Sequence, residues 1–396
     1  MKILVLAWEF PPRIVGGIAR HVAELYPEIV NLDHDIHLVT VEFGSALRTE
    51  IVEGIKVHRV PVAPNDNFFQ WVINMNESMQ KEAEHLIATT GTFDLIHAHD
   101  WLVAQSAIAL KHQFKIPLVA TIHATEYGRH NGIHNETQVY IYRQESYLVY
   151  NAWRVIVCSG YMRHEVHRVF NCPWDKIDVV YNGIRAEKKR HPPYFNHQEF
   201  RRKFAADDEK IVYYVGRMTY EKGVQVLINA APRILNAMEG KVKFIIVGGG
   251  FTQHLKDQVI ELGIWNRFYF TGFMPEDDLD KFQTVADCAV FPSLYEPFGI
   301  VALESFASKV PVVVSNAGGL PEVVRHGETG ITTYANDYNS LAWGVLEILH
   351  NPEYAQILVK NAYEDLEKRF QWSKLAEQTV AVYGLILHQR RMVTWG

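Results

Sequence analysis

The feature that most constrains the fold is a regular alternation of short apolar runs with longer segments of helical periodicity. Apolar runs with the length of buried strands recur through the first half of the chain, at 2–8, 36–41, 95–97, 118–122 and 155–158. Stretches with apolar residues at helical spacing lie between them, at 19–30, 78–89 and 103–114. This alternation is typical of parallel strands connected by helices. We therefore expect an α/β protein with a mostly parallel sheet.

A second series of the same kind begins near residue 210. Its apolar runs fall at 211–215, 243–247, 268–271, 288–291 and 311–315. Between the two series, Asn182 and Gly183 introduce a stretch with many charges and two prolines, the composition of a hinge. A chain of 396 residues, 48% of them hydrophobic, is long enough for two cores. We predict Rossmann-like domains over 1–182 and 183–374.

Charge and cysteine content argue against several classes of protein. The net charge is −6 and no long basic tract is present, which argues against a nucleic-acid partner. The three cysteines, Cys158, Cys172 and Cys288, lack Cys-x-x-Cys spacing, so we expect neither disulfides nor a zinc site, and a cytoplasmic location. The apolar run at the N-terminus is too short for a signal peptide or a membrane span and indicates a first buried strand.

Two glutamates set eight residues apart carry most of the functional information. Glu296 follows the apolar run 288–291 through a Glu-Pro-Phe-Gly break, and Glu304 lies in the helical segment after it. We expect Glu296 on a strand-to-helix loop, at the carboxyl edge of the sheet where ligands bind, and Glu304 about two turns into the helix. Carboxylates about 10 Å apart suit hydroxyls at the two ends of a sugar nucleotide. A capping or surface pair is the alternative.

Glycines and cations follow two other predicted strands. Gly16 and Gly17 come after the first strand at the start of a helix, where their amides can approach a diphosphate. An ordinary helix-entry turn is the alternative. Arg217 and Lys222 follow the first strand of the second series. Their planar guanidinium and compact ammonium groups together can neutralise the charge of a diphosphate. Two solvated loop cations are the alternative.

Polar side chains follow predicted strands of the first domain as well. His123 comes directly after the run 118–122, where a lone histidine is more often structural than catalytic. Asp100 follows the strand at 95–97 and either orients an acceptor hydroxyl or caps the next helix. Four nearby residues lack convincing ligand spacing, so we predict a polar acceptor loop and no metal there: Glu126, His130, His134 and Glu136.

A basic segment surrounds the predicted hinge. Its residues are Arg185, Lys188, Lys189, Arg190, Arg201, Arg202 and Lys203. Such runs in linkers are usually solvated faces, and contact with anionic lipid is the less favoured alternative.

Taken together and in order, these motifs resemble those of retaining glycosyltransferases of family 4. The Gly16-Gly17 loop, Thr121-Ile-His-Ala-Thr-Glu, Gly216-Arg-x-x-x-x-Lys-Gly and Glu-Pro-Phe-Gly-x-x-x-x-Glu span nearly the whole chain. The likeness is nearest to the glycogen-synthase-like branch that includes an actinobacterial α-1,4-glucosyltransferase of methylglucose lipopolysaccharide. It implies the GT-B fold, in which two Rossmann-like domains face each other across a cleft, with a terminal helix at about 375–396 packing back on the first domain.

The resemblance also implies roles for individual residues. It implies that His123 lies beside the donor hexose and positions it in the transition state, and that Arg217 and Lys222 stabilise the departing diphosphate. It also implies that Glu296 orients the donor hydroxyls and that Glu304 holds the ribose. The remaining donor contacts are Gly16, Gly17, Phe273, Met274, Phe298, Gly299, Ile300, Gly318 and Gly319. The acceptor contacts are Asp100, Glu126 and Arg129.

The implied activity is retaining transfer of a hexose, expected to be glucose, from UDP-glucose or ADP-glucose to a saccharide hydroxyl, without cofactor or metal. The expected acceptor is an α-1,4-glucan or oligosaccharide. A sugar phosphate, as in sucrose-phosphate synthases, or a lipid is the alternative acceptor. A sugar-nucleotide epimerase or a non-catalytic binding protein is the alternative from another class.

Overall fold

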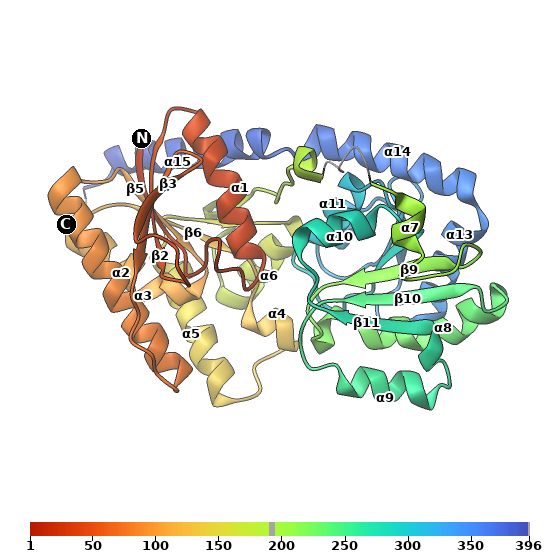
Figure 1. Ribbon diagram of the computed structural model, residues 1–396. Coiled ribbons are helices and arrows are strands. Elements are labelled where there is room, and N and C mark those ends of the chain that lie inside the picture. Colours follow the sequence, from red (N-terminus) through yellow and green to blue (C-terminus); the bar gives the residue numbers. More distant parts are fainter. Residues whose placement is uncertain (190–194, 395–396) are drawn as a thin grey trace. The chain divides into compact units, whose positions relative to one another are not determined.

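The computed structural model describes residues 1–189 and 195–394, which divide into two compact units (Figure 1). The N-terminal unit comprises Met1–Gly183 together with Trp372–Gly396, and the C-terminal unit is Ile184–Gln371. The segment that returns to the N-terminal unit therefore begins at Trp372, slightly earlier than the 375 expected from the sequence. Arg190 of the basic segment lies outside the described residues.

The N-terminal unit is built on an eight-stranded sheet with strand order β3-β4-β2-β1-β5-β6-β7-β8. Neighbouring strands are parallel except for the antiparallel pair β3 and β4, a hairpin that the sequence did not indicate. The strands are β1 (Lys2–Leu6), β2 (Asp35–Val41), β3 (Thr49–Val52), β4 (Ile55–Val60), β5 (Leu95–His99), β6 (Leu118–Ile122), β7 (Arg154–Val157) and β8 (Ile177–Val179). The helices are α1 (Gly17–Asn31), α2 (Phe68–Thr90), α3 (Ala104–Phe114), α4 (Glu126–His130), α5 (Glu136–Asn151), α6 (Gly160–Phe170) and α15 (Trp372–Arg391), with short 3₁₀ turns η1 (Trp101–Val103) and η2 (Trp174–Lys176).

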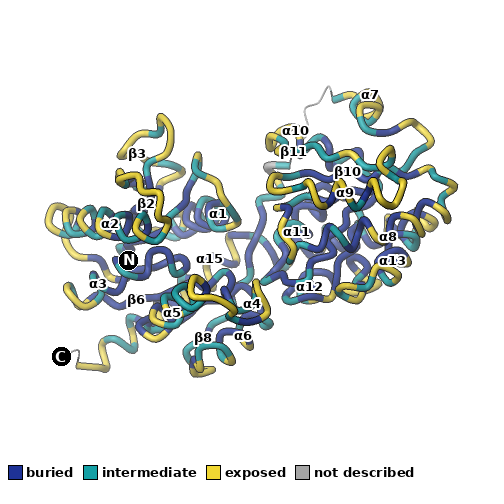
Figure 2. The backbone as a smooth tube through the Cα atoms, turned by 90° about the horizontal axis from the view of Figure 1, so that it is seen from below, coloured by how far each residue is buried: buried dark blue, intermediate teal, exposed yellow. Residues whose placement is uncertain are grey.

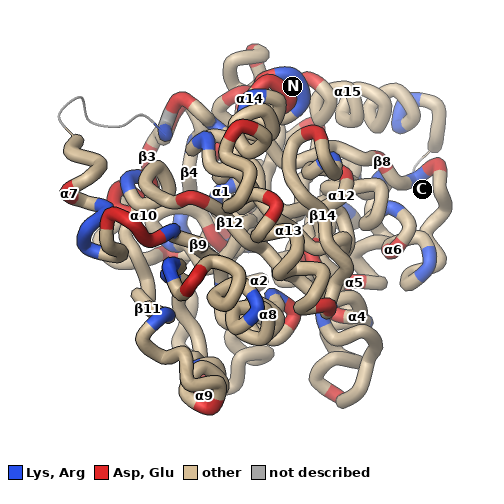
Figure 3. Tube along the Cα trace, turned by 90° about the vertical axis from the view of Figure 1, so that its right-hand side faces the viewer, with Lys and Arg blue, Asp and Glu red and all other residues tan. Residues whose placement is uncertain are grey.

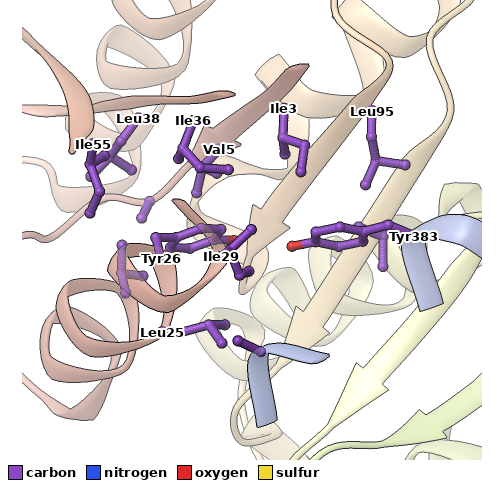
Figure 4. Close-up of a cluster of buried hydrophobic side chains, with 14 of the residues drawn as sticks. Ile3, Val5, Leu25, Tyr26, Ile29, Ile36, Leu38, Ile55, Leu95 and Tyr383 are labelled. Atoms are coloured by element: carbon purple, nitrogen blue, oxygen red, sulfur yellow. The ribbon is translucent and has the colours of Figure 1, made fainter. Parts of the chain in front are cut away.

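Helix α15 completes the core of the N-terminal unit. It packs against α1, and its buried Leu375, Tyr383 and Ile386 belong to the same cluster as residues of β1, β2 and β5. The indole of Trp372 donates a hydrogen bond to Glu24 at 2.6 Å. Figure 4 shows the Tyr383 hydroxyl turned toward that of Tyr26. The terminal helix is therefore an integral layer of this unit.

The C-terminal unit has a six-stranded, wholly parallel sheet with strand order β11-β10-β9-β12-β13-β14. Its strands are β9 (Lys210–Val215), β10 (Val242–Val247), β11 (Phe268–Gly272), β12 (Cys288–Phe291), β13 (Val312–Ser315) and β14 (Ile331–Thr333). Its helices are α7 (His197–Arg201), α8 (Val224–Ala237), α9 (Gln253–Glu261), α10 (Glu276–Gln283), α11 (Ile300–Ala307), α12 (Leu320–Val323), α13 (Tyr338–His350) and α14 (Pro352–Arg369), with 3₁₀ turns η3 (Ala186–Lys189), η4 (Tyr220–Lys222) and η5 (Trp265–Arg267). The predicted α/β class with parallel sheets is confirmed.

The central strands of both sheets are buried over most of their length (Figure 2). Strands covered by helices on both faces have no solvent side, which explains why the sequence shows continuous apolar runs instead of alternation. Each sheet also has one point where the strand order reverses, between β1 and β5 in the first and between β9 and β12 in the second. Ligands bind doubly wound sheets at the carboxyl ends of strands beside such a point.

Three cations of the basic segment are paired with carboxylates of the C-terminal unit. Arg201 pairs with Asp287 at 2.7 Å, Arg202 hydrogen-bonds Asp207 through both nitrogens of its fork, and Lys189 contacts Asp280 of the acidic helix α10. Figure 3 shows basic and acidic positions interspersed around α7 and α10. Among the described residues, no helix is both long enough and apolar enough to cross a membrane.

Candidate functional site

An ion pair lies at the reversal point of the C-terminal sheet. Glu296 is in the loop between β12 and α11, and Lys222 is in η4 of the loop after β9. The Lys222 Nζ donates to the Glu296 Oε2 at 2.8 Å, and the Ser293 hydroxyl donates to the same oxygen at 3.3 Å. Only 21% of the Lys222 side chain and 10% of the Glu296 side chain are exposed. Two residues predicted from separate motifs are thus brought into contact.

A tight glycine turn after β13 holds the backbone of Glu296. Gly318 has φ of +60°, and a Cβ at this position would lie 1.9 Å from the Glu296 carbonyl oxygen. The amide of Gly319 donates to that carbonyl oxygen at 2.8 Å. Only glycine permits both the left-handed conformation and this close approach. The observed contact of the predicted Gly318-Gly319 turn is therefore with Glu296.

Two helices begin beside the ion pair. Helix α8 starts after Gly223, the residue that follows Lys222, and α11 starts after Gly299, where an added Cβ would lie 3.8 Å from the Glu296 side chain. Neither N-cap residue provides a side-chain acceptor for the first amides of its helix. Phe298, which precedes this cap, is buried. Uncapped amides and the helix dipole make such a place favourable for a phosphate.

Other predicted donor residues lie on the same unit. Arg217 follows β9, with its side chain 55% exposed and its Nη2 3.8 Å from the Oε1 of Glu221. Glu304 is buried on α11. Because α11 begins at Ile300, Glu304 lies just over one turn into the helix, and the expected two turns were wrong. Phe273 is exposed and, with Met274, follows the edge strand β11.

The amides of the glycine loop of the N-terminal unit donate hydrogen bonds to the carboxylate of Glu9, a residue that the sequence analysis did not single out. The Glu9 Oε2 accepts hydrogen bonds from the amides of Val15 at 2.6 Å and Gly16 at 2.9 Å. Burial raises the pKa of Glu9, and these amide bonds act in the opposite direction. Gly17 begins α1. A diphosphate would therefore reach the predicted Gly16 amide only after displacing Glu9.

Asp100 joins the ends of β5 and β6. Its Oδ1 accepts from the amide of His123 at 2.8 Å, and its own amide donates to the carbonyl of Thr121 at 3.0 Å. Its side chain makes no capping hydrogen bond to the η1 turn that follows, so the capping alternative is wrong. Burial raises the pKa of Asp100 to about 6, against the opposing effects of the His123 amide and of Arg129.

His123 belongs to a network of buried histidines. Its Nε2 lies 3.1 Å from the Nδ1 of His99, whose Nε2 lies 2.7 Å from the Tyr26 hydroxyl. His97 shares that hydroxyl at 2.8 Å and also contacts Tyr383 of α15 at 2.7 Å. Burial lowers the pKa of His123 to about 3, so its imidazole is neutral at physiological pH. Histidine at alternate positions of a strand, as at 97 and 99, was the sequence signal for a shared face.

The other two predicted acceptor residues, Glu126 and Arg129, lie on α4. Glu126 is buried, and its Oε1 lies 3.2 Å from His130, while Arg129 is exposed. The amide of Glu126 donates to Glu145 of α5 at 2.9 Å, and burial holds the pKa of Glu145 well above its usual range. Sequence reasoning missed Glu145, because nothing in the sequence around it marks it as buried.

The two groups of side chains suit different chemistry. In the C-terminal unit, a cation, a carboxylate and two helix N-termini suit a ligand that combines phosphates with hydroxyls. In the N-terminal unit, neutral imidazoles and buried carboxyls suit hydrogen bonding to uncharged hydroxyl groups.

Comparison with known proteins gives consistent matches over both units. Residues 15–188 match the model of Glycosyltransferase Family 4, and residues 196–365 match that of Glycosyl transferases group 1. An uncharacterized glycosyltransferase of Methanocaldococcus jannaschii is 38% identical, covering 98% of this chain and 99% of that protein. A glycogen synthase of Mycobacterium tuberculosis is 35% identical, covering 97% and 94%. The structure of a sucrose-phosphate synthase from Thermosynechococcus elongatus has a TM-score of 0.83 at 24% identity, covering 98% of this chain and 99% of that chain.

Proposed function

We propose that this chain, which belongs to the group 1 and family 4 glycosyltransferases and has their GT-B fold, is a retaining enzyme that transfers glucose from a nucleoside diphosphate sugar to a saccharide hydroxyl. The donor is UDP-glucose or ADP-glucose, and the acceptor is an α-1,4-glucan or oligosaccharide. The name of the 35% identical glycogen synthase supports the choice of acceptor.

The observation that carries the proposal is the convergence of Lys222, Glu296 and the first turns of α8 and α11 at the reversal point of the C-terminal sheet. A nucleoside diphosphate sugar presents a diphosphate beside a sugar rich in hydroxyls. The helix N-termini and Lys222 can bind the negatively charged phosphates, and the Glu296 carboxylate can accept hydrogen bonds from the sugar hydroxyls.

In the mechanism that we propose, Lys222 and Arg217 stabilise the charge that develops on the diphosphate as the glycosidic bond breaks. Glu296 holds the donor hydroxyls, and Glu304 holds the ribose. The acceptor oxygen attacks the anomeric carbon on the face that the diphosphate leaves, and its proton passes to the departing phosphate oxygen. His123, with its amide fixed on Asp100, positions the hexose.

The reaction is tested by incubating the purified chain with UDP-glucose, ADP-glucose or GDP-mannose, each with maltooligosaccharides or with hexose phosphates. Glucose transfer to a maltooligosaccharide with an α-configured product, seen by NMR, supports the proposal. Transfer only to a hexose phosphate favours the sugar-phosphate alternative. Donor isomerisation without acceptor identifies an epimerase, and donor binding without turnover identifies a binding protein.

A further inference from the structure

Three imidazoles from separate elements of the N-terminal unit converge on one point. His21 is on α1, His99 ends β5, and His123 follows β6. One ring nitrogen of each histidine lies within 4.8 Å of one ring nitrogen of each of the other two. Among the described residues, these three histidines are the group that could hold a metal ion. The four residues weighed from the sequence, Glu126, His130, His134 and Glu136, do not form such a group there.

The outer nitrogens of His21 and His99 already have oxygen partners. The Nδ1 of His21 lies 2.8 Å from the Oδ1 of Asn182, and the Nε2 of His99 lies 2.7 Å from the hydroxyl of Tyr26. An oxygen acceptor at one ring nitrogen holds the proton there and leaves a lone pair on the other. Outer partners of this type orient the histidine ligands of metal sites.

The inner nitrogens are incompletely satisfied. The Nε2 of His21 has no hydrogen-bond partner, and it is buried, because the residue is only 5% exposed. The Nδ1 of His99 and the Nε2 of His123 share one hydrogen bond at 3.1 Å. The edge of the His21 ring lies against His123, with ring centroids 4.8 Å apart. A buried polar atom without a partner calls for an explanation, and a bound ion is one.

We propose that His21, His99 and His123 form a binding site for a divalent transition-metal ion of the zinc class. Neutral imidazole is a preferred ligand of such ions, with metal–nitrogen distances of about 2.0–2.1 Å. Tetrahedral geometry then places ligand nitrogens roughly 3.3 Å apart, close to the separation of His99 and His123, so His21 supplies most of the movement. His123 is partly exposed, which leaves a fourth position for water.

Binding requires no net loss of protons. The ion replaces the hydrogen bond between His99 and His123. Because the proton of His99 is held on its Nε2 beside Tyr26, the proton of that bond belongs to the Nε2 of His123 and moves to the Nδ1 of the same ring. The three imidazoles stay neutral and donate only lone pairs.

Occupation of the site fixes His123 and therefore inhibits transfer. This consequence rests on the proposed function, because it assumes that His123 meets the donor hexose. Ion binding itself does not, and it is measured with no sugar nucleotide present.

The test is titration of the chelator-treated full-length chain with Co²⁺, followed by ligand-field absorption, and then displacement by Zn²⁺. We expect one equivalent with a tetrahedral spectrum. His21→Leu should weaken binding by at least 100-fold, and Asn182→Ala by about 10–100-fold because it removes only the outer partner. The matched control is His58→Gln, since His58 lies 3.1 Å from His37 in a buried pair that belongs to no group of three potential metal ligands among the described residues.

Failure to bind Co²⁺ or Zn²⁺ at stoichiometric concentration overturns the proposal, as does an affinity of the His21→Leu or Asn182→Ala variant equal to that of the wild type. Thermal unfolding without metal shows whether each variant is folded. If the His21→Leu variant is not folded, the Co²⁺ affinity of the Asn182→Ala variant is the test. If glucosyl transfer is never observed, the Co²⁺ titration still tests the site. If transfer is observed, Zn²⁺ should inhibit the Asn182→Ala variant less than the wild type.

Discussion

Lys222 and Glu296 form an ion pair, with the Nζ and Oε2 atoms 2.8 Å apart, although 74 residues separate them in the chain. Each partner therefore holds the other in place at the carboxyl edge of the sheet. A cation that is already oriented need not reorganise as charge develops on a leaving group, which is the basis of electrostatic catalysis. The same pairing means that a change at one residue disturbs the other.

Lys222→Ala and Arg217→Ala should each lower turnover by about 10²-fold or more. Removal of one preorganised group from a site of developing charge typically costs about 3–4 kcal/mol. Steady-state rates of glucosyl transfer, normalised to the folded fraction, measure the effect. Lys360→Ala is the control, since 77% of that side chain is exposed in the same unit. Near-wild-type turnover in either variant would remove that residue from the donor site.

Lys222→Ala should also lower stability, whereas Arg217→Ala should not. Loss of Lys222 leaves the Glu296 carboxylate mostly buried without its cation, and breaking a buried pair costs about 3–5 kcal/mol, less here because 21% of the Lys222 side chain is exposed. Arg217 is half-exposed and only loosely paired with Glu221. Urea denaturation of both variants and of Lys222→Ala/Glu296→Gln provides the comparison. Restored stability in the double variant is expected, and an unchanged deficit would contradict this account.

Glu304→Gln should weaken nucleotide binding more than it slows chemistry, and Glu296→Gln should do the reverse. A ribose contact is the same in the ground state and the transition state, while contacts to the hexose hydroxyls tighten as the ring distorts. Calorimetric titration with the nucleoside diphosphate, beside steady-state rates, gives both quantities. Equal losses of affinity in the two variants would mean that the division of roles is mistaken.

Gly318→Ala should lower both stability and turnover, while Gly249→Ala should leave both nearly unchanged. The methyl group at 318 would meet the Glu296 carbonyl oxygen at 1.9 Å in a left-handed backbone, so the loop that carries Glu296 must move. Gly249 also follows a strand of this sheet, but its added Cβ meets nothing within 4 Å. Thermal unfolding and transfer rates test the pair of variants. Comparable effects at the two positions would argue against the turn as a support for Glu296.

The parts of this site that the sequence predicts are those marked by local patterns. Continuous apolar runs indicate buried parallel strands, and the loops that follow them, which carry Lys222 and Glu296, fall at the carboxyl edge of the sheet. Contacts made across long stretches of chain leave no local pattern. Tyr383 meets His97 across 286 residues, and only the packing of α15 onto the N-terminal unit brings them together.

Glu9 and the boundaries of α11 show two further limits. Glu9 precedes a Pro-Pro turn and has no pattern that predicts its return to the amides of Val15 and Gly16. Helix α11 begins only at Ile300, so the first half of the eight-residue spacing from Glu296 to Glu304 lies in a loop. The expected two turns treated the whole spacing as helix, which is why the depth of Glu304 in the helix was overestimated.

Glucosyl transfer should survive an excess of EDTA. In the proposed mechanism, Lys222, Arg217 and the N-termini of α8 and α11 neutralise the diphosphate, so no divalent ion is needed there. Rates before and after chelation, and after addition of Mg²⁺ or Mn²⁺, test this. Loss of turnover that Mg²⁺ or Mn²⁺ restores would disprove the metal-free mechanism. A rise in turnover on chelation would instead fit release of an inhibitory ion from the histidine cluster.

Asp100→Asn should stabilise the chain at neutral pH but not at acidic pH. Burial raises the pKa of Asp100 to about 6 from an ordinary value of 3.8. Between these values the unfolded chain has released the proton that the native chain still holds, so the free energy of unfolding falls as pH rises through this window. A difference of about two pKa units corresponds to on the order of 3 kcal/mol. Asparagine removes this titration and keeps an oxygen that can accept from the His123 amide.

Urea denaturation of both proteins at intervals from pH 4 to pH 7 measures the difference in unfolding free energy. Glu9 and Glu145 also have raised pKa values, so the wild type and the variant share their contribution and only the difference reports on Asp100. We expect the two proteins to be nearly equal at pH 4 and the variant to gain stability progressively up to pH 7. A difference that stays constant with pH would show that Asp100 is already ionised at pH 4, and that the His123 amide and Arg129 outweigh the cost of its burial.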